Sequence, residues 1–294
     1  MSTLKCLFKK NQMNKLLLIL LVTTAQLSFG QDLLSLLNEE SDGPKIVNSI
    51  FKDSRVVNAQ STKQSSKGEF KFLIQHRFGT LNSGFYNLWG IDNSQVRMGL
   101  DYGISDRIAV SVGRSSTNKQ YDVSVKGKLL NQTDKSPVVV SVFSAVFVAH
   151  PSEFLRQQTD YDFLNQISFA NQLIVARKFS SKFSALILPT HIHLNTFESG
   201  TSADPLFFGL GGRYKLSKRV TVNAEYFYAL SDMVEVHKNM LSVGFDIETG
   251  GHVFSLHLSN SRGMNEHTFL TQTTGDILEG DIYFGFNISR VFQW

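Results

Sequence analysis

The chain has 294 residues, a single cysteine and a formal net charge of +4. Its first 30 residues contain four lysines and no acidic residue, so the 29 basic residues of the chain fall to 25 beyond residue 30, against 25 acidic ones. The rest of the chain is therefore close to neutral, which removes the charge argument for nucleic-acid binding. The cysteine, Cys6, also lies in the first stretch, so the remaining residues form neither disulfides nor cysteine-ligated metal sites.

The N-terminus has the pattern of a secretory signal peptide. Four lysines between residues 5 and 15 precede an apolar run over residues 16–25, and the small residues Ser28 and Gly30 suit cleavage before Gln31. The run is too short to cross a bilayer as a helix, and no later segment has the roughly 18 apolar residues that a helical span needs. We therefore expect residues 1–30 to be a cleaved signal peptide, and any membrane insertion to occur through a β-barrel.

Residues 31–68 are predicted to form a separate N-terminal region. Residues 32–37 are a short apolar helix candidate, and residues 60–68 (QSTKQSSKG) have the composition of a polar linker. Neither stretch shows the alternating pattern that follows it. We expect a periplasmic N-terminal segment and linker, either mobile or packed under the barrel.

A two-residue alternation of apolar and polar side chains runs from residue 69 to the C-terminus. In residues 69–79, Phe70, Phe72 and Ile74 alternate with Lys71 and Gln75. Such a period places one set of side chains on each face of a strand. The pattern predicts an all-β fold, an antiparallel up-and-down transmembrane β-barrel of about 12 strands, over residues 69–294. The expected strands cover residues 69–79, 95–102, 108–114, 120–131, 138–150, 163–179, 183–195, 205–216, 220–228, 241–249, 252–260 and 280–294.

The connections between these strands alternate between short and long. Short turns fall at residues 105–106, 180–182, 217–218 and 250–251, with a slightly longer one at 132–136. Long connections fall at 80–94, 151–161, 196–204, 230–239 and 261–279, and residues 115–119 are a modest exception. Three short turns share one pattern, in which a Ser-x-basic sequence stands between two apolar residues: ISDRI, FSSKF and LSKRV. The alternation is typical of an outer-membrane barrel with short periplasmic turns and long extracellular loops.

The last predicted strand has the clearest two-faced pattern. Ile282, Phe284 and Phe286 lie on one face and Asp281 and Asn287 on the other, so one face suits lipid and the other suits water. Taken alone, the segment also fits a half-buried strand of a soluble sandwich. The strand ends at Trp294, and a terminal aromatic residue resembles the signal read by the outer-membrane insertion machinery. We therefore expect outer-membrane lipids and that machinery as partners.

Four segments resemble a family of uncharacterised bacterial outer-membrane β-barrel proteins, and together they extend over nearly the whole chain beyond the signal peptide. They are FKDSRVVNAQS, FLIQHRFGTLNSGFYNLWGIDNSQVRMGLDYGISDRIAV, GLGGRYKLSKRVTVNAEY and GDIYFGFNISRVF. The resemblance implies the fold and a location in the cell outer membrane of a diderm bacterium. It implies no established substrate.

Charged residues of both signs occur on the predicted inner face of the barrel. In a narrow barrel, such charges either pair across the lumen as a plug or line a selective aqueous path. The sequence leaves both alternatives open. The predicted lumen-lining residues are Arg77, Arg97, Asp101, Arg213, Glu225 and Asp246, and Lys71, Lys215 and Glu248 share their face.

Two histidines are weak candidates for a metal or haem site. His191 and His193 lie two residues apart, so they occupy one face of a strand, a spacing that suits two metal ligands. No third ligand stands near them in the sequence. We therefore predict no metal and no cofactor.

The sequence HLSN at residues 257–260 resembles the core of outer-membrane phospholipase A, in which a histidine activates a serine hydroxyl. In that enzyme family the pair faces lipid. Here Phe254, Leu256 and Leu258 take the lipid face, which turns His257 and Ser259 inward. Ser261 also replaces the glycine of that motif, so a lipid hydrolase is a minor alternative.

A non-enzymatic role is the leading expectation. The inner charges are compatible with passive transport of a small solute, and a structural or adhesive role is the other possibility. Phe85, Tyr86 and Trp89 in the first long loop suit loop packing or an interfacial position more than sugar stacking. No glycine-rich phosphate loop follows a strand, so a nucleotide site is not expected.

Overall fold

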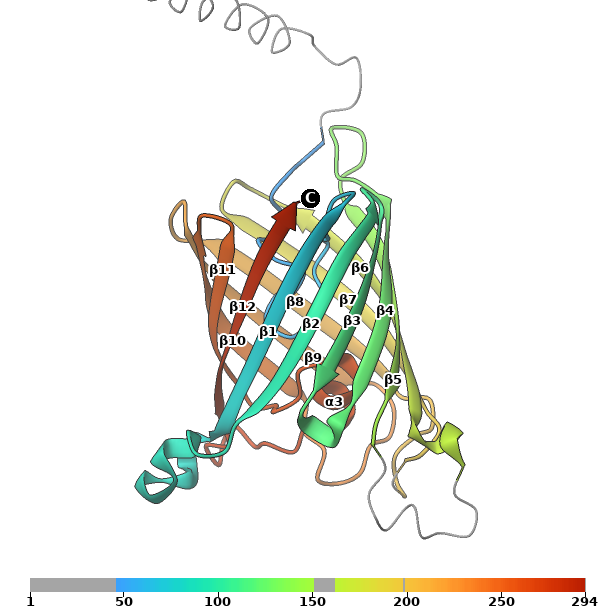
Figure 1. Cartoon of the computed structure of the whole chain (residues 1–294), viewed down its shortest axis with the longest axis vertical. Helices are drawn as coiled ribbons and strands as arrows, with labels where there is room; N and C mark the ends of the chain where they lie inside the picture. The colour runs from blue at the N-terminus through green and yellow to red at the C-terminus, as the bar shows by residue number, and fades with distance from the viewer. Residues whose placement is uncertain (1–45, 151–161, 198, 294) are drawn as a thin grey trace, which may run out of the picture. The chain divides into compact units, whose positions relative to one another are not determined.

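The computed structural model describes residues 46–150, 162–197 and 199–293, which form one closed antiparallel barrel (Figure 1). Consecutive strands are neighbours around the ring, and β1 pairs with β12 to close it. The predicted fold class and the strand number of 12 are therefore confirmed. The strands are β1 (Glu69–Thr80), β2 (Gln95–Ser105), β3 (Ile108–Ser115), β4 (Tyr121–Leu130), β5 (Val139–Val148), β6 (Ile167–Lys178), β7 (Phe183–Leu194), β8 (Leu206–Lys215), β9 (Val220–Ala229), β10 (Met240–Thr249), β11 (His252–Ser259) and β12 (Tyr283–Gln293).

Helices are short and lie in the connections. The α-helix α3 (Glu266–Thr271) lies between β11 and β12, and 3-10 helices cover Leu81–Ser83, Phe85–Gly90, Thr117–Lys119 and Phe163–Gln166. Within the described ranges, no helix is both long and apolar enough to span a membrane. The predicted signal peptide at residues 1–30, the helix candidate at 32–37, the connection at 151–161 and the terminal Trp294 lie outside the described residues.

Side chains alternate between the two faces of the wall. On β1, Lys71 and Arg77 are buried inside the barrel, whereas Phe72 is exposed on the outside. The same register continues across the closing seam, where Ile74 pairs with Ile288. The outer face therefore carries the apolar set of each alternating strand, as a surface in contact with lipid requires.

The repeated Ser-x-basic turns have one local cause. In each turn the serine hydroxyl accepts a hydrogen bond from the backbone N–H three residues later, at 3.1 Å for Ser105, 3.0 Å for Ser180 and 3.1 Å for Ser217. Such side-chain bonds stabilise tight turns. All three turns lie at the same end of the barrel, which we call the short-turn end; the opposite end is the long-loop end (Figure 1).

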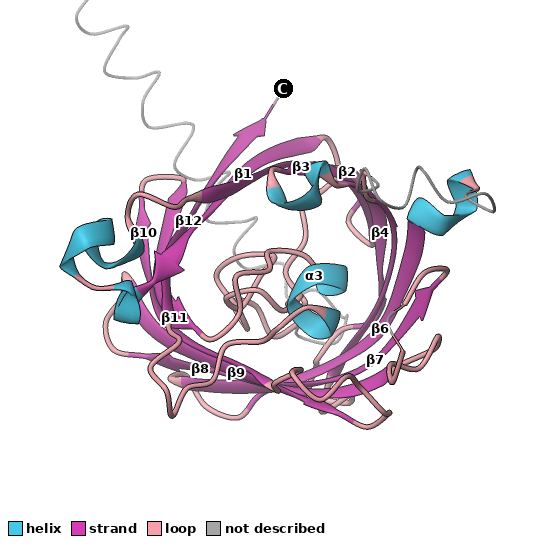
Figure 2. Cartoon of the chain, turned by 90° about the horizontal axis from the view of Figure 1, so that it is seen from below, coloured by secondary structure: helices cyan, strands magenta, loops and turns pink. Residues whose placement is uncertain are grey.

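Residues 46–68, which we name the plug segment, enter the barrel at the short-turn end and fold inside it (Figures 1 and 2). Val57, Asn58 and Ala59 are fully buried there. Residues 31–68 are predicted from the sequence as a region apart from the barrel, and the described part of that region differs from the prediction. The reason is that its apolar side chains pack on the inner wall while its polar groups bond to inward charges, and neither contact leaves a periodic pattern in the sequence.

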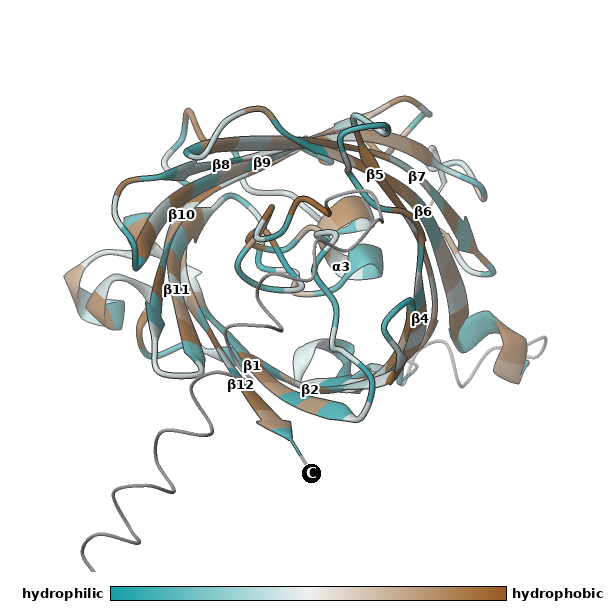
Figure 3. Cartoon of the chain, turned by 90° about the horizontal axis from the view of Figure 1, so that it is seen from above, coloured by the Kyte–Doolittle hydropathy of each residue, from teal (hydrophilic) through white to brown (hydrophobic). Residues whose placement is uncertain are grey.

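The inner face of the barrel has an apolar part and a larger polar part. In Figure 3, which colours each residue by hydropathy, brown stretches are prominent on β5–β7. We call the inner faces of β5–β8 the apolar wall, since they carry most of the buried apolar side chains, and those of β1–β4 and β9–β12 the polar wall. Ile50, Phe51 and Val56 of the plug segment belong to the same buried cluster as the apolar wall, as do Phe269 and Leu270 of α3. The core of the molecule thus lies inside the barrel, where a water-filled channel would otherwise run.

Candidate functional site

The candidate site is the lumen and the plug segment within it. The plug segment forms a small hairpin, since Arg55 and Gln60 are joined by an antiparallel bridge and the N–H of Val56 donates to the carbonyl of Ala59 at 2.8 Å. The tip of this hairpin presents three backbone N–H groups in one direction. A carboxylate accepts such a set of donors well because it carries several lone pairs.

Glu225 on β9 supplies that carboxylate. It accepts hydrogen bonds from the backbone N–H groups of Val57 at 3.0 Å, Asn58 at 2.8 Å and Ala59 at 2.9 Å. Glu225 is 2% exposed, so these bonds form out of contact with bulk water. The hairpin tip is therefore fixed to one strand of the polar wall by a buried charge.

The opposite side of the tip is held by β1 and β12. The guanidinium of Arg77 donates to the side-chain oxygen of Asn58 and, at 3.1 Å, to that of Asn287. The Asn287 amide in turn donates to the carbonyl of Val57 at 2.9 Å. Arg77 is fully buried and lies between plug and wall.

Lysines of the polar wall hold the middle of the plug segment. The ammonium of Lys71 forms ion pairs at 2.9 Å with Asp53 of the plug segment and with Asp101 of β2. Lys126 on β4 donates to the backbone carbonyls of Ser54 at 3.2 Å and Ser61 at 3.1 Å. A charged group without such partners inside the barrel would cost several kcal/mol, on the order of the desolvation penalty of a buried ion.

Two of the predicted lumen residues bond within the wall. Arg97 forms an ion pair with Asp122 of β4 and donates to Gln75 at 2.9 Å. A Cβ atom at Gly113, on the strand between them, would lie 2.3 Å from the Arg97 guanidinium, so the pair needs glycine at that position. Asp246 accepts a hydrogen bond from the amide of Asn223.

The six predicted lumen-lining residues therefore all lie on the inner face, and they divide by partner. Four of them contact the plug segment: Arg77 and Glu225 at the hairpin tip, Asp101 through the hydroxyl of Ser54 at 3.3 Å, and Arg213 through the carbonyls of residues 49 and 50 at 2.9 and 2.8 Å. Arg97 and Asp246 form their described hydrogen bonds and ion pair with wall residues.

The helix α3 fills the lumen from the long-loop end (Figure 2). It begins at a capping box, in which the Asn265 side chain accepts from the N–H of Thr268. Glu266 in its first turn pairs with Arg55 and accepts from Gln60 at 2.9 Å, so the helix and the plug hairpin meet inside the barrel. Phe269 packs on Phe227 of β9, with ring centroids 5.4 Å apart.

His267 on α3 faces the wall. Its Nδ1 lies 2.7 Å from the amide nitrogen of Gln120, and its ring lies 6.0 Å from that of Phe147. Burial lowers the pKa of His267 to about 4. The imidazole is therefore neutral near pH 7, and the hydrogen bond from Gln120 assigns the acceptor nitrogen.

Several residues of the site are absent from the sequence-based set. Arg55 and Asn58 lie in the plug segment and Glu266 lies in a loop, and none of these segments has a strand period that would assign a face. Asp122 and Lys126 are different, because Tyr121, Val123 and Val125 alternate with them on β4. That alternation was sufficient to place both residues inside.

His191 and His193 lie near the long-loop end of β7. Asp204 accepts from both rings, with its Oδ1 atom 3.2 Å from His191 and 2.6 Å from His193, and the hydrogen bond from His193 lowers the pKa of Asp204. Within the described residues, no group of three histidine, cysteine or acidic side chains is arranged to hold a metal ion. The carboxylate of Asp204 is thus a hydrogen-bond partner of both histidines.

His257 and Ser259 are 2% exposed and face inward. Neither ring nitrogen of His257 has a hydrogen-bond partner among the described residues, so the imidazole forms no hydrogen bond with Ser259. The Ser259 hydroxyl accepts from Ser242 at 2.8 Å. This geometry does not provide the activated serine that a lipid hydrolase needs.

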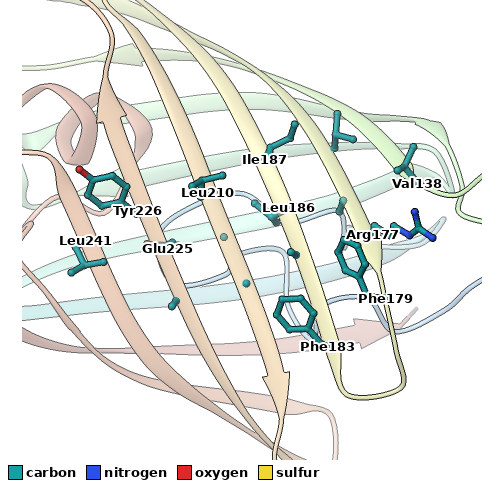
Figure 4. A pocket seen from close by; sticks show the side chains of 16 residues that line it. Val138, Arg177, Phe179, Phe183, Leu186, Ile187, Leu210, Glu225, Tyr226 and Leu241 are labelled. Carbon is teal, nitrogen blue, oxygen red and sulfur yellow. The ribbon is translucent and has the colours of Figure 1, made fainter.

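The outer wall carries a shallow apolar groove of about 540 Å³ over β6–β9 (Figure 4). Phe183, Ile187 and Leu210 line it together with the small residues Ala185 and Gly212. Inside the barrel, between the plug segment and the polar wall, only about 20 Å³ remains in the cavity beside Arg97 and Lys126. That space holds about one water molecule.

Residues 51–292 match the family described as membrane bound beta barrel domain (DUF5777), and the chain belongs to this family. The resemblance to an uncharacterised membrane-barrel family is thus confirmed, and the outer apolar face of the strands is a lipid-facing surface. The match begins at residue 51, so the family unit includes most of the plug segment. No curated protein sequence matches the chain.

Solved structures with a similar fold are bacterial porins and channels. They include the KdgM porin (TM-score 0.47, 6% identity, 76% of this chain and 99% of that one) and the NanC porin (0.46, 9%, 76% and 99%). An outer membrane channel from Pseudomonas putida F1 is also similar (0.48, 10%, 78% and 97%). At these TM-scores the likeness concerns barrel architecture and carries no argument about function.

Proposed function

We propose that this membrane-bound barrel is a gated pore of the bacterial outer membrane, exported through a cleaved signal peptide, in which the plug segment closes the path of a small polar solute. The role is non-enzymatic. The short-turn end faces the periplasm and the long loops face outward, as in single-chain outer-membrane barrels. The partners are outer-membrane lipids and, through the C-terminal segment of the chain with its terminal Trp294, the insertion machinery.

The observation that carries this proposal is the way in which Glu225 holds the plug segment. Its three contacts are hydrogen bonds to backbone N–H groups, which water can replace when the segment leaves. The strand ladder closes without the plug segment, because β1 pairs with β2 and β12 along its length. Removal of the plug therefore breaks no strand pairing.

Removal of the plug segment would expose an inner face of the barrel whose side chains suit a path for polar solutes. Arg77, Asn223 and Glu225 all lie on the polar wall and are buried beneath the plug segment. A lumen with fixed charges of both signs attracts water and passes small polar molecules. A barrel with only a structural role has no use for such an interior, because apolar packing would fill it at lower cost.

Single-channel recording in planar bilayers tests the proposal. The chain that begins at residue 69 lacks the plug segment and should show larger and longer openings than the chain that begins at residue 31. A chain that begins at residue 46 is the matched control, since it retains the plug segment, and it should behave as the longer chain does. Equal currents from all three refolded barrels would contradict the gated pore and favour a structural role.

A further inference from the structure

A wide vestibule opens at the short-turn end, beside the point where the plug segment enters the barrel. Its volume is about 760 Å³. Its walls come from separate parts of the chain: both ends of the plug segment, the turn after β2, the end of β4, and the turn between β8 and β9. The vestibule is therefore a concave site built by the fold.

The vestibule is strongly basic. Two acids line it, Asp106 and Glu248, and both are already engaged: Glu248 pairs with Lys52, and Asp106 accepts from the backbone N–H of Lys67 at 3.1 Å. Seven cationic side chains line it: Lys52, Lys63, Arg107, Lys128, Arg213, Lys215 and Lys218.

Five of these cations form no ion pair among the described residues, namely Lys63, Arg107, Lys128, Lys215 and Lys218. Lys128 and Lys215 are the informative pair, because they are half-buried on the inward faces of β4 and β8. Half-buried cations that line one cavity lose part of their hydration and add to its positive potential. An anion in the cavity would offset both effects.

Arg213 provides a second observation of a different kind. It is 7% exposed, and two of its bonds go to the plug carbonyls of Ser49 and Ile50, but its Nε–H group has no partner among the described residues. Buried donors in native proteins are almost always bonded. The unbonded Nε–H group of Arg213, next to the basic vestibule, is therefore a donor that a bound anion could engage.

We infer that this vestibule binds a small multivalent anion that carries phosphate or carboxylate groups. A single charge would not balance cations that come from several elements, whereas a ligand with two or three charged groups can bind more than one of them in the same cavity. The role of this anion in transport rests on the proposed function. If the barrel is a gated pore, the vestibule identifies the class of solute that passes through it. The plug segment forms part of the site, so occupancy and plug position are coupled.

Calorimetric titration of the folded full chain in detergent tests the site, with inorganic pyrophosphate and citrate as probes and chloride as the monovalent reference. The double variant Lys128→Gln/Lys215→Gln should weaken binding by about tenfold or more, since it removes two Coulomb contacts from one ligand. Lys135→Gln/Lys182→Gln is the matched control, because it removes the same charge from exposed turns at the same end, and it should bind as the parent does. Added salt should weaken binding of the parent protein.

The possible outcomes distinguish phosphate from other anions, and they distinguish failure of the anion site from failure of the gated pore. Binding of pyrophosphate alone assigns phosphate, binding of both probes assigns multivalent anions in general, and either result supports the site. No binding above that of chloride, or an equal loss in the control variant, overturns it. The bilayer recordings test the gated pore independently of the anion site. Anion binding without any plug-dependent current would contradict the gated pore and support the anion site. Plug-dependent current without anion binding would support the gated pore and contradict the anion site.

Discussion

The apolar wall and the polar wall of the barrel face the same plug segment with different chemistry. The apolar wall offers Phe143, Ile174 and Leu188, which belong to one buried cluster with Ile50 and Phe51 of the plug segment. The polar wall offers charged groups that form hydrogen bonds and ion pairs with specific atoms of the plug segment, such as the backbone N–H groups bound by Glu225. Apolar packing depends mainly on area and shape, whereas hydrogen bonds to Glu225 or Arg77 depend on position to within a few tenths of an ångström.

The difference separates stability from gating. The apolar wall stabilises the filled barrel mainly by packing, and its bonds to the plug segment, from Lys178 and Arg213 to the carbonyls of residues 48–50, lie at the short-turn end. The polar wall fixes the position of the plug segment through bonds that water can replace, so it is the side on which a small change shifts the equilibrium between closed and open. Substitutions on the two walls should therefore affect different measurements.

The largest loss of stability is expected for Phe227→Ala, because Phe227, although it lies on β9, belongs to the same buried apolar cluster as the apolar wall. Phe227 is 1% exposed and packs against Phe269 of α3, so its removal leaves a cavity between wall and helix. We expect the free energy of unfolding to fall by about 3–5 kcal/mol. Urea unfolding in detergent measures this, and Phe245→Ala, on the exposed outer face of β10, is the control with a smaller loss. A similar loss in both variants would mean that the interior of the barrel is not packed.

A smaller loss of stability with a large effect on gating is expected for Glu225→Gln. The amide keeps one acceptor oxygen but loses the charge that holds three N–H donors, at a cost of about 1.5–3 kcal/mol. Single-channel recording should show a higher open fraction than in the parent. Glu235→Gln, in an exposed loop, should leave the open fraction unchanged. An equal open fraction in the Glu225→Gln and Glu235→Gln variants would mean that the polar wall does not position the plug segment.

A more local effect is expected for Glu266→Gln, which weakens the contact between α3 and the plug hairpin. Loss of the ion pair with Arg55 should speed hydrogen exchange at residues 55–60 and in α3, while the strands keep their protection. Glu279→Gln lies in the same connection but is exposed, and it serves as the control. Faster exchange throughout the barrel would contradict a local role for Glu266.

The smallest expected effect is a dependence on pH. Because the pKa of His267 is lowered to about 4 by burial, against about 6.5 when unfolded, the unfolded chain binds more protons between these values. The stability of the docked helix is therefore full above pH 6.5 and is lost progressively as pH falls to about 4. Unfolding of the parent and of His267→Gln should be compared over this range, and the variant should show the flatter profile.

The strands were predictable because alternation is a local property. Lys71 and Phe72 show their faces in the sequence, and the Ser-x-basic turns give the short-turn end. The period is weaker over residues 138–149, which are apolar on both faces, since their inner side packs on the plug segment and α3. The pairing of Arg55 with Glu266 had no sequence signal, because the two residues lie 211 positions apart in segments without a period.

The central claim is that the plug segment closes the lumen on the polar wall, and a crosslink tests it most directly. The amide of Asn58 lies 3.1 Å from the Ser242 hydroxyl, and the chain has no cysteine beyond Cys6. In Asn58→Cys/Ser242→Cys, a short reducible thiol crosslinker should join the two positions in the folded barrel and suppress openings until it is reduced. In Asn58→Cys/Lys135→Cys, with its second cysteine in an outer turn, it should not. Crosslinking of 58 to 135 but not to 242, or openings that persist in the joined 58–242 protein, would contradict the account.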